Sequence, residues 1–247
     1  MIRQHPVGST NRHKLQPNLT PNATNNAMDS SELATVIKRR QTWKVLAPVD
    51  RPVTHPAETL ERGDRKLGEA ISAAGWAPFH YDRAADGIAE PWRVHVLNQT
   101  KCQALATEFS TLFTDIKSTN KLPGMLSGCG ALALVTWLPQ FSYGVHSEEE
   151  GTAREKQIQV DEEHLAATSA YVQNLLLLLT AEGLGTYWSS GGQFRTPTMF
   201  GHLKIPAEQR LLAAVFVDYS IESTSFERIG GKLRDQRSPS DKWTRWV

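Results

Sequence analysis

Several well-known chemical signatures are missing from these 247 residues. Only two cysteines occur, Cys102 and Cys129, and neither has the CxxC or Cys/His spacing of a zinc site. Two distant cysteines are typical of a reduced, cytoplasmic protein, in which both would serve as packing residues. No GxGxxG follows an expected strand, and no P-loop, HExxH or GxSxG motif is present. The sequence therefore contains none of the motifs that usually indicate a metal hydrolase, a nucleophilic hydrolase or a Rossmann-type dinucleotide binder.

The chain also has little net charge and no long apolar run. Its charge of +1 does not indicate a general nucleic-acid or membrane-surface binder. The longest apolar stretch, Leu165–Leu179, is broken by polar residues and is too short to span a bilayer. Residues 1–29 are rich in Asn, Thr and Pro, lack the apolar segment of a signal peptide, and are expected to form a disordered tail. Residues 30–247 are then expected to form one domain without a metal site.

The order of the expected elements mixes helices and strands without a regular βαβ repeat, so an α+β fold is predicted. Helices are predicted over 32–40, 58–74, 100–116, 162–182 and 196–203. Strands are predicted over 92–97, 131–137, 186–189 and 211–217. The strand over 131–137 is apolar throughout, which predicts burial on both faces. Ser30 or Ser31 is expected to cap the first helix, and the segments 76–91 and 140–157 are expected to be loops.

The predicted helix over 162–182 carries apolar residues around almost its whole circumference. They include Leu165, Ala170, Val172 and the run Leu175–Leu179. Such a helix in a soluble protein must be buried on all sides. In a chain of this size, that pattern predicts a helix in the core of a homodimer.

The first predicted helix ends in Lys-Arg-Arg and is followed by Gln-Thr-Trp-Lys. This segment resembles the opening of the nitroreductase-like FMN family, in which arginines and a serine hold the FMN phosphate. A phosphate of charge about −2 favours guanidinium groups and a hydroxyl or amide donor. One alignment places Arg39, Arg40 and Gln41 on the family's two arginines and serine. The other uses Arg40, Thr42 and Lys44, with Lys44 a candidate for the flavin N1/O2 edge. Alternatively, these cations only complement a helix C-terminus.

The segment Gly75–His80 reads Gly-Trp-Ala-Pro-Phe-His, and Pro91-Trp92 follows after a loop. It resembles the family's Ala-Pro loop and Gln-Pro-Trp, which lie along the flavin. The resemblance implies that His80 is a donor to the ring edge and that its charge state could bias flavin reduction. Alternatively, His80 is a loop histidine without a role.

The segment Gly183–Gly192 reads Gly-Leu-Gly-Thr-Tyr-Trp-Ser-Ser-Gly-Gly. It resembles the family's Gly-Leu-Gly-x-x-Trp and the glycine turn after it, whose backbone amides face the flavin. Glycine suits this position because it lets the backbone approach a flat ring closely. The resemblance implies a cofactor-binding set of Trp188, Ser189, Ser190, Gly191 and Gly192. Alternatively, Gly183 only caps a helix and Trp188 is only a core residue.

Two further segments extend the resemblance. Met199–Pro206 resembles the family's Leu-Gly-Ile-Pro, while Asp218-Tyr219-Ser220 stands where the family has Gly-Tyr/Phe-Pro. In the basic tail, the resemblance implies that Arg234 or Arg237, with Lys232 nearby, would return a cation to the phosphate. Alternatively, these are solvated surface charges.

The resemblance runs from about Glu32 to Tyr219 and implies a three-layer α-β-α fold around a mixed, mostly antiparallel sheet. It implies a homodimer in which each FMN touches both subunits. NADH or NADPH would reduce FMN, which would reduce a small electron-poor acceptor such as a nitro compound or quinone, with no catalytic side chain. The loops over 76–91 and 140–157 would flank the acceptor. A flavin carrier or sensor with little turnover, or another flavin-dependent reaction such as dehydrogenation or dehalogenation, remains an alternative.

Overall fold

The computed structural model describes residues 29–84, 86–114, 120–140, 152–219 and 227–247. The expected tail therefore lies outside the described residues except for Asp29. So does most of the loop expected over 140–157.

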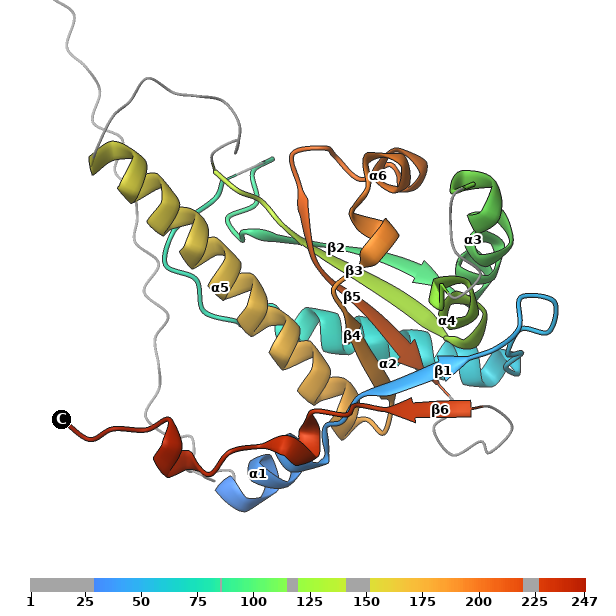
Figure 1. The fold of residues 1–247 in the computed structure, drawn as a ribbon, viewed down its shortest axis with the longest axis horizontal. Coiled ribbons are helices and arrows are strands. Elements are labelled where there is room, and N and C mark those ends of the chain that lie inside the picture. Colours follow the sequence, from blue (N-terminus) through green and yellow to red (C-terminus); the bar gives the residue numbers. More distant parts are fainter. Residues whose placement is uncertain (1–28, 85, 115–119, 141–151, 220–226) are drawn as a thin grey trace, which may run out of the picture.

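A four-stranded antiparallel sheet forms the centre of the fold (Figure 1). Its strands, in spatial order, are β2 (Trp92–Asn98), β3 (Ala131–Trp137), β5 (Arg210–Asp218) and β4 (Gly185–Ser189). Strand β3 is buried along its whole length, which confirms the prediction from its apolar run. A second sheet pairs β1 (Trp43–Leu46) with β6 (Glu227–Gly230), and a parallel bridge joins Thr42 to Thr186 of β4. The pairing is thus mixed and mostly antiparallel, as predicted.

Helices cover both faces of the four-stranded sheet (Figure 1). They are α2 (Ala57–Ala74), α3 (Gln99–Leu112), α4 (Leu122–Gly128), α5 (Thr152–Ala181) and α6 (Pro197–Leu203), while α1 (Ser30–Arg39) packs against α5. Helices α2 and α5 pack with Ala133 and Val135 of β3 in one core, while α3, α4 and α6 pack with Leu132 and Leu134 in the other. Neighbouring residues of a strand point to opposite faces, so β3 contributes to both cores. The result is the expected three-layer α-β-α arrangement.

Helix α5 begins earlier than predicted. It spans 30 residues from Thr152, so residues 152–157, expected to be part of a loop, are helical. The segment Ala-Arg-Glu-Lys-Gln consists of residues with high helix propensity, and its polarity reflects a solvent-facing position rather than a loop. One face of α5 is buried in the single chain, including Tyr171, Leu175 and Leu179.

Two other local predictions were wrong, and some elements were missed. Asp29, rather than Ser30 or Ser31, caps α1, because its carboxylate accepts a hydrogen bond from the Ser31 backbone N–H at 2.9 Å. Helix α3 ends at Leu112 instead of continuing to residue 116. Helix α4 and strand β6 were not predicted. Pro and Gly near the start of α4 hide its helical pattern, although proline is compatible with a first helical turn.

Asp218 and Tyr219, which depart from the family's motif, hold the end of β5 to β6 and α2 through hydrogen bonds. Tyr219 lies against two glycines, since a Cβ atom added to Gly63 or Gly130 would come within 2.4 Å of its ring. Its hydroxyl donates to Asp64 Oδ1 at 2.6 Å, and burial raises the pKa of Tyr219 far above its usual value. Asp218 accepts a hydrogen bond from Arg228 Nε at 2.8 Å in a buried ion pair that ties β6 to β5.

Two buried histidines are expected to make the fold less stable in mild acid. Burial lowers the pKa of His55, with Asp218 opposing and Arg228 adding to the shift. Burial also lowers the pKa of His164; the Leu138 and Tyr81 carbonyls and Asp161 oppose this shift, and Arg83 adds to it. The folded pKa values lie below the unfolded value of about 6.5. The contribution of the two neutral, buried histidines to stability is therefore complete above about pH 6.5. It is lost as the pH falls below that value.

The measurement is the melting temperature between about pH 7.5 and 5.5. The wild-type protein should melt at lower temperature as the pH falls, and His164→Gln should flatten that slope. His80→Gln, at an exposed position, serves as the control and should leave the slope unchanged. A wild-type melting temperature that rises across this range would contradict the assignment.

None of the described helices combines the length and hydropathy that a membrane crossing requires.

Candidate cofactor site

Three arginines gather where the chain leaves α1 and the C-terminal segment returns to it. The guanidinium of Arg234 donates hydrogen bonds to the backbone carbonyls of Lys38 and Arg40. Burial lowers the pKa of Arg40, and the charges of Arg234 and Arg237 lower it further. Among the described residues, no carboxylate forms an ion pair with any of the three. Like charges held together without a counter-charge favour the binding of an anion.

The extended chain after Arg40 presents alternate side chains on one side. Residues two apart share a face of an extended strand, so Thr42, which bridges to Thr186, and Lys44, in β1, lie on the same side. The backbone of Gly231 approaches Thr42 closely, since a Cβ added there would lie 3.1 Å from the Thr42 Cβ. Lys44 Nζ lies 4.5 Å from the centre of the Tyr187 ring. Of the other predicted residues, Arg39 is exposed at the end of α1, and Gln41 alternates onto the opposite side.

The glycine turn follows at the far end of β4. Gly191 has φ +106° and Gly192 has φ +53°, a region that glycine adopts without strain. The Gly191 N–H donates to Ser189 Oγ at 3.2 Å, and Arg195 donates to the carbonyl of Ser190. A Cβ on Gly191 would lie 2.5 Å from Leu211 Cδ2, so the backbone has no room for a side chain. The turn is fixed, and the backbone of Gly192 is exposed.

The arginine cluster and the glycine turn lie near opposite ends of β4. Thr186 bridges to Thr42 near the cluster, and Ser190 begins the turn. Four residues of extended chain separate them, a span of about 13 Å. Trp188 lies between, half-buried against the core that contains α2 and α5. This strand therefore connects an anion-binding end to a glycine-lined end.

His80 lies apart from both groups within one chain. It is exposed in the loop between α2 and β2, and no contact given for the described residues joins it to the arginines or the turn. Figure 1 shows this loop running past the middle of α5, whereas α1 lies beside the C-terminal end of that helix. A single chain therefore connects the segment of Arg40 with the glycine turn through β4, but it does not bring His80 to either of them.

The two cysteines serve as packing residues of the core. Cys102 and Cys129 are free and buried in the core with α3 and α4, and the pKa of Cys102 is raised by the neighbouring Cys129 thiol and by burial. No cluster of His, Cys, Asp or Glu in the described residues could hold a metal ion. Arg234 and Arg237 were the two tail candidates from the sequence, and Arg234 is the one that hydrogen-bonds to the backbone at the end of α1.

Residues 63–218, more than half of the chain, match the model of the nitroreductase family. The chain belongs to the nitroreductase family. It is thereby a member of a family of oxidoreductases. The matched range contains the glycine turn and His80 but neither Arg40 nor the C-terminal arginines, so the arginine cluster stands on geometry alone.

Solved structures share this fold. A nitroreductase-like protein from Bacillus cereus is 22% identical, with a TM-score of 0.56 over 87% of this chain and 95% of that chain. A nitroreductase from Desulfovibrio desulfuricans in complex with FMN is 19% identical, with a TM-score of 0.53 over 87% and 96%. An FMN-dependent nitroreductase from Mycobacterium smegmatis in complex with NADPH is 16% identical, with a TM-score of 0.52 over 89% and 100%. No curated protein matches the sequence.

Proposed function

We propose that this family member is a homodimeric, cytoplasmic, FMN-dependent oxidoreductase that uses NADH or NADPH to reduce an electron-poor acceptor such as a nitro compound or quinone. The observation that carries the proposal is the arginine cluster, whose cations repel one another and form no ion pair with a carboxylate of the described residues. FMN has a phosphate that such a cluster would neutralise, and solved proteins of the same fold from two organisms are described as containing or requiring FMN. The two buried free thiols favour a reducing compartment.

The residues at the anion-binding end fit a phosphate. Arg40 and Arg237 would supply the charge, and the Thr42 hydroxyl would donate a hydrogen bond. Arg234 uses part of its guanidinium to fix the backbone at Arg40, so it would orient the site as well as add charge. Thr42 and Lys44 share a side of the chain directly after Arg40, which favours the second of the two alignments. Arg39 and Gln41 belong to the first alignment and would then be peripheral.

The residues along β4 fit a flat ring. Lys44 would place its ammonium at the electron-rich edge of the flavin, since it is held over the Tyr187 ring rather than neutralised by a described carboxylate. Backbone N–H groups at Ser190 and Gly192 would donate to the ring edge, with Trp188, Ser189 and Gly191 beside them. When bound, FMN supplies hydride acceptance from the nicotinamide and electron donation to the acceptor. The protein's part is to orient both reactants and exclude water.

The exposed side of α5 supports the homodimer. Leu165 and Leu177 are only half-buried in the single chain, and neither belongs to the core that buries Tyr171, Leu175 and Leu179. A second copy packed there would bury them, since apolar surface on a helix favours association. The same packing would let His80 reach the flavin of the other subunit, which would explain its distance from the arginine cluster. Sedimentation equilibrium should give twice the chain mass.

An absorbance spectrum and a turnover assay test the proposal. The purified protein should be yellow and release FMN, not FAD, on denaturation. It should then oxidise NADH or NADPH steadily with a nitroaromatic or quinone present. A colourless protein that does not bind added FMN would overturn the proposal.

A carrier or sensor is the second candidate. The exposed position of His80 favours it, because no hydrogen bond among the described residues holds the His80 imidazole in place. Flavin binding without steady turnover would support that reading.

A further inference from the structure

A cleft of about 460 Å³ lies between the 3₁₀ turn Gly192–Arg195, helix α6 and the start of β5. Its walls are mainly apolar, formed by Pro197, Phe200, Ile205, Ala207 and Leu211. This volume and lining suit a small molecule with an apolar body. In Figure 1, α6 lies on the opposite side of the sheet from α5, so a dimer formed through α5 would leave the cleft accessible.

The charged residues lining this cleft are all cations. Arg195 and Arg210 line it, and no aspartate or glutamate does. The guanidinium of Arg195 is held by two backbone carbonyls, those of Ser190 and Leu212, and not by an ion pair with a described carboxylate. Carbonyl acceptors orient the group and leave its positive charge uncompensated. An anionic end on the ligand would compensate it with a charge-assisted hydrogen bond.

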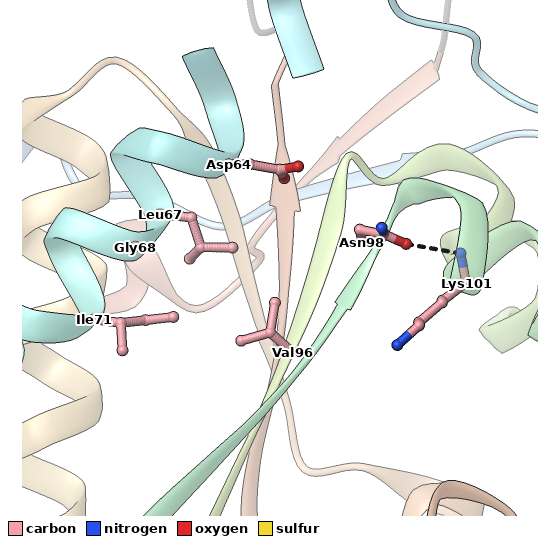
Figure 2. Close-up of a pocket in the computed structure, with 7 residues that line it drawn as sticks. All are labelled: Asp64, Leu67, Gly68, Ile71, Val96, Asn98 and Lys101. Carbon is pink, nitrogen blue, oxygen red and sulfur yellow. Dashed lines mark hydrogen bonds between the residues drawn. The ribbon is translucent and has the colours of Figure 1, made fainter. Parts of the chain in front are cut away.

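A second cleft shows that this pattern is not general to the surface. It holds about 230 Å³ between α2, β2 and the start of α3 (Figure 2). Its lining combines the apolar Leu67, Ile71 and Val96 with Asp64 and Lys101, so it presents charges of both signs. Asp64 is further engaged by the Tyr219 hydroxyl. This cleft provides a matched control with one cation beside an apolar surface.

The first cleft also touches the glycine turn. Arg195 lines the cleft and hydrogen-bonds to the Ser190 carbonyl, and Leu211 lines it and limits the space at Gly191. A ligand that moves or fixes Arg195 therefore acts on Ser190 and Gly191 through direct contacts.

We propose that this cleft binds a small monocarboxylate with an apolar or aromatic body and that its occupancy is transmitted to the glycine turn through Arg195. Binding itself depends only on the cleft. The consequence for electron transfer rests on the proposed flavin site, because the same turn would face the ring there.

The test is titration calorimetry of the purified protein with phenylacetate, with benzylamine and benzyl alcohol as the cationic and neutral comparisons. Phenylacetate should bind saturably, and the other two at least about ten-fold more weakly. Arg195→Gln should weaken phenylacetate binding about 10–100-fold, whereas Lys101→Gln in the second cleft should leave it unchanged. Equal binding of the three compounds, or an unchanged affinity in Arg195→Gln, would overturn the proposal.

A second variant tests the cleft without removing a charge. Gly201 lines it, and nothing lies within 4 Å of a Cβ added there, so Gly201→Leu should fold and occupy the cleft. It should abolish phenylacetate binding. Backbone-amide NMR should show the Gly191 and Gly192 signals moving with phenylacetate in the wild type and not in Arg195→Gln. Unmoved glycine signals on saturation would refute the coupling, and none of these readouts requires flavin.

Discussion

Replacing Asp218 with asparagine is expected to lower the free energy of unfolding by about 3–5 kcal/mol. The Asp218 carboxylate accepts from Arg228 Nε at 2.8 Å, and their side chains are only 2% and 10% exposed. An amide cannot neutralise the guanidinium, so a nearly buried cation would lose the carboxylate that it binds at 2.8 Å. Urea denaturation followed by circular dichroism measures the loss.

An exposed ion pair provides the control for this substitution. Arg65 and Glu69 lie one turn apart on α2 with more than half of each side chain exposed, so Glu69→Gln should cost no more than about 0.5 kcal/mol. The double variant Asp218→Asn with Arg228→Gln should be more stable than Asp218→Asn alone, because no charge is left unpaired. A loss below about 1 kcal/mol in Asp218→Asn would show that the pair does not fasten the strand.

The same ion pair connects stability to the candidate cofactor site. Strand β6 is held to β1 by its ladder and to β5 by Arg228, and the chain then continues to Arg234 and Arg237. Loosening β6 would release these two cations from Arg40. The Asp218 variant should therefore also bind FMN more weakly than the Glu69 variant, even where both remain folded.

The sheet and most helices could be predicted because each carries a local pattern. The apolar run of β3 and the long apolar helix need only the period of buried residues and the length of the segment. The start of α5 was missed because residues 152–157 carry no such apolar pattern. Their polar sequence resembles that of a loop. Helix α4 was missed because its burial depends on packing against α3 and β1, which no local pattern reveals.

The candidate site was predictable only in pieces. The Arg40 and glycine-turn segments resemble family motifs, and β4 explains why they belong to one site. The contribution of Arg234 depends on a long return of the tail to α1 through the short strand β6. Such non-local pairing leaves almost no trace in four residues of sequence.

Replacing Arg40 with alanine is expected to raise the dissociation constant for FMN about 10–100-fold. Arg40 is half-buried beside Arg234 and Arg237, so removal of its guanidinium takes away the least solvated charge of the cluster. Quenching of flavin fluorescence on titration with protein measures the affinity. Riboflavin, which has the same ring and no phosphate, should bind the variant and the wild type equally.

The neighbouring arginine makes this test specific for position rather than charge. Arg39→Ala removes the same charge from an exposed side chain one residue away, and it should weaken FMN binding less than about three-fold, because screened surface charges contribute little. If Arg39→Ala instead has the larger effect, the alignment through Arg39, Arg40 and Gln41 is correct and Thr42 and Lys44 lose their assigned roles. If both variants weaken riboflavin as much as FMN, the cluster does not hold the phosphate.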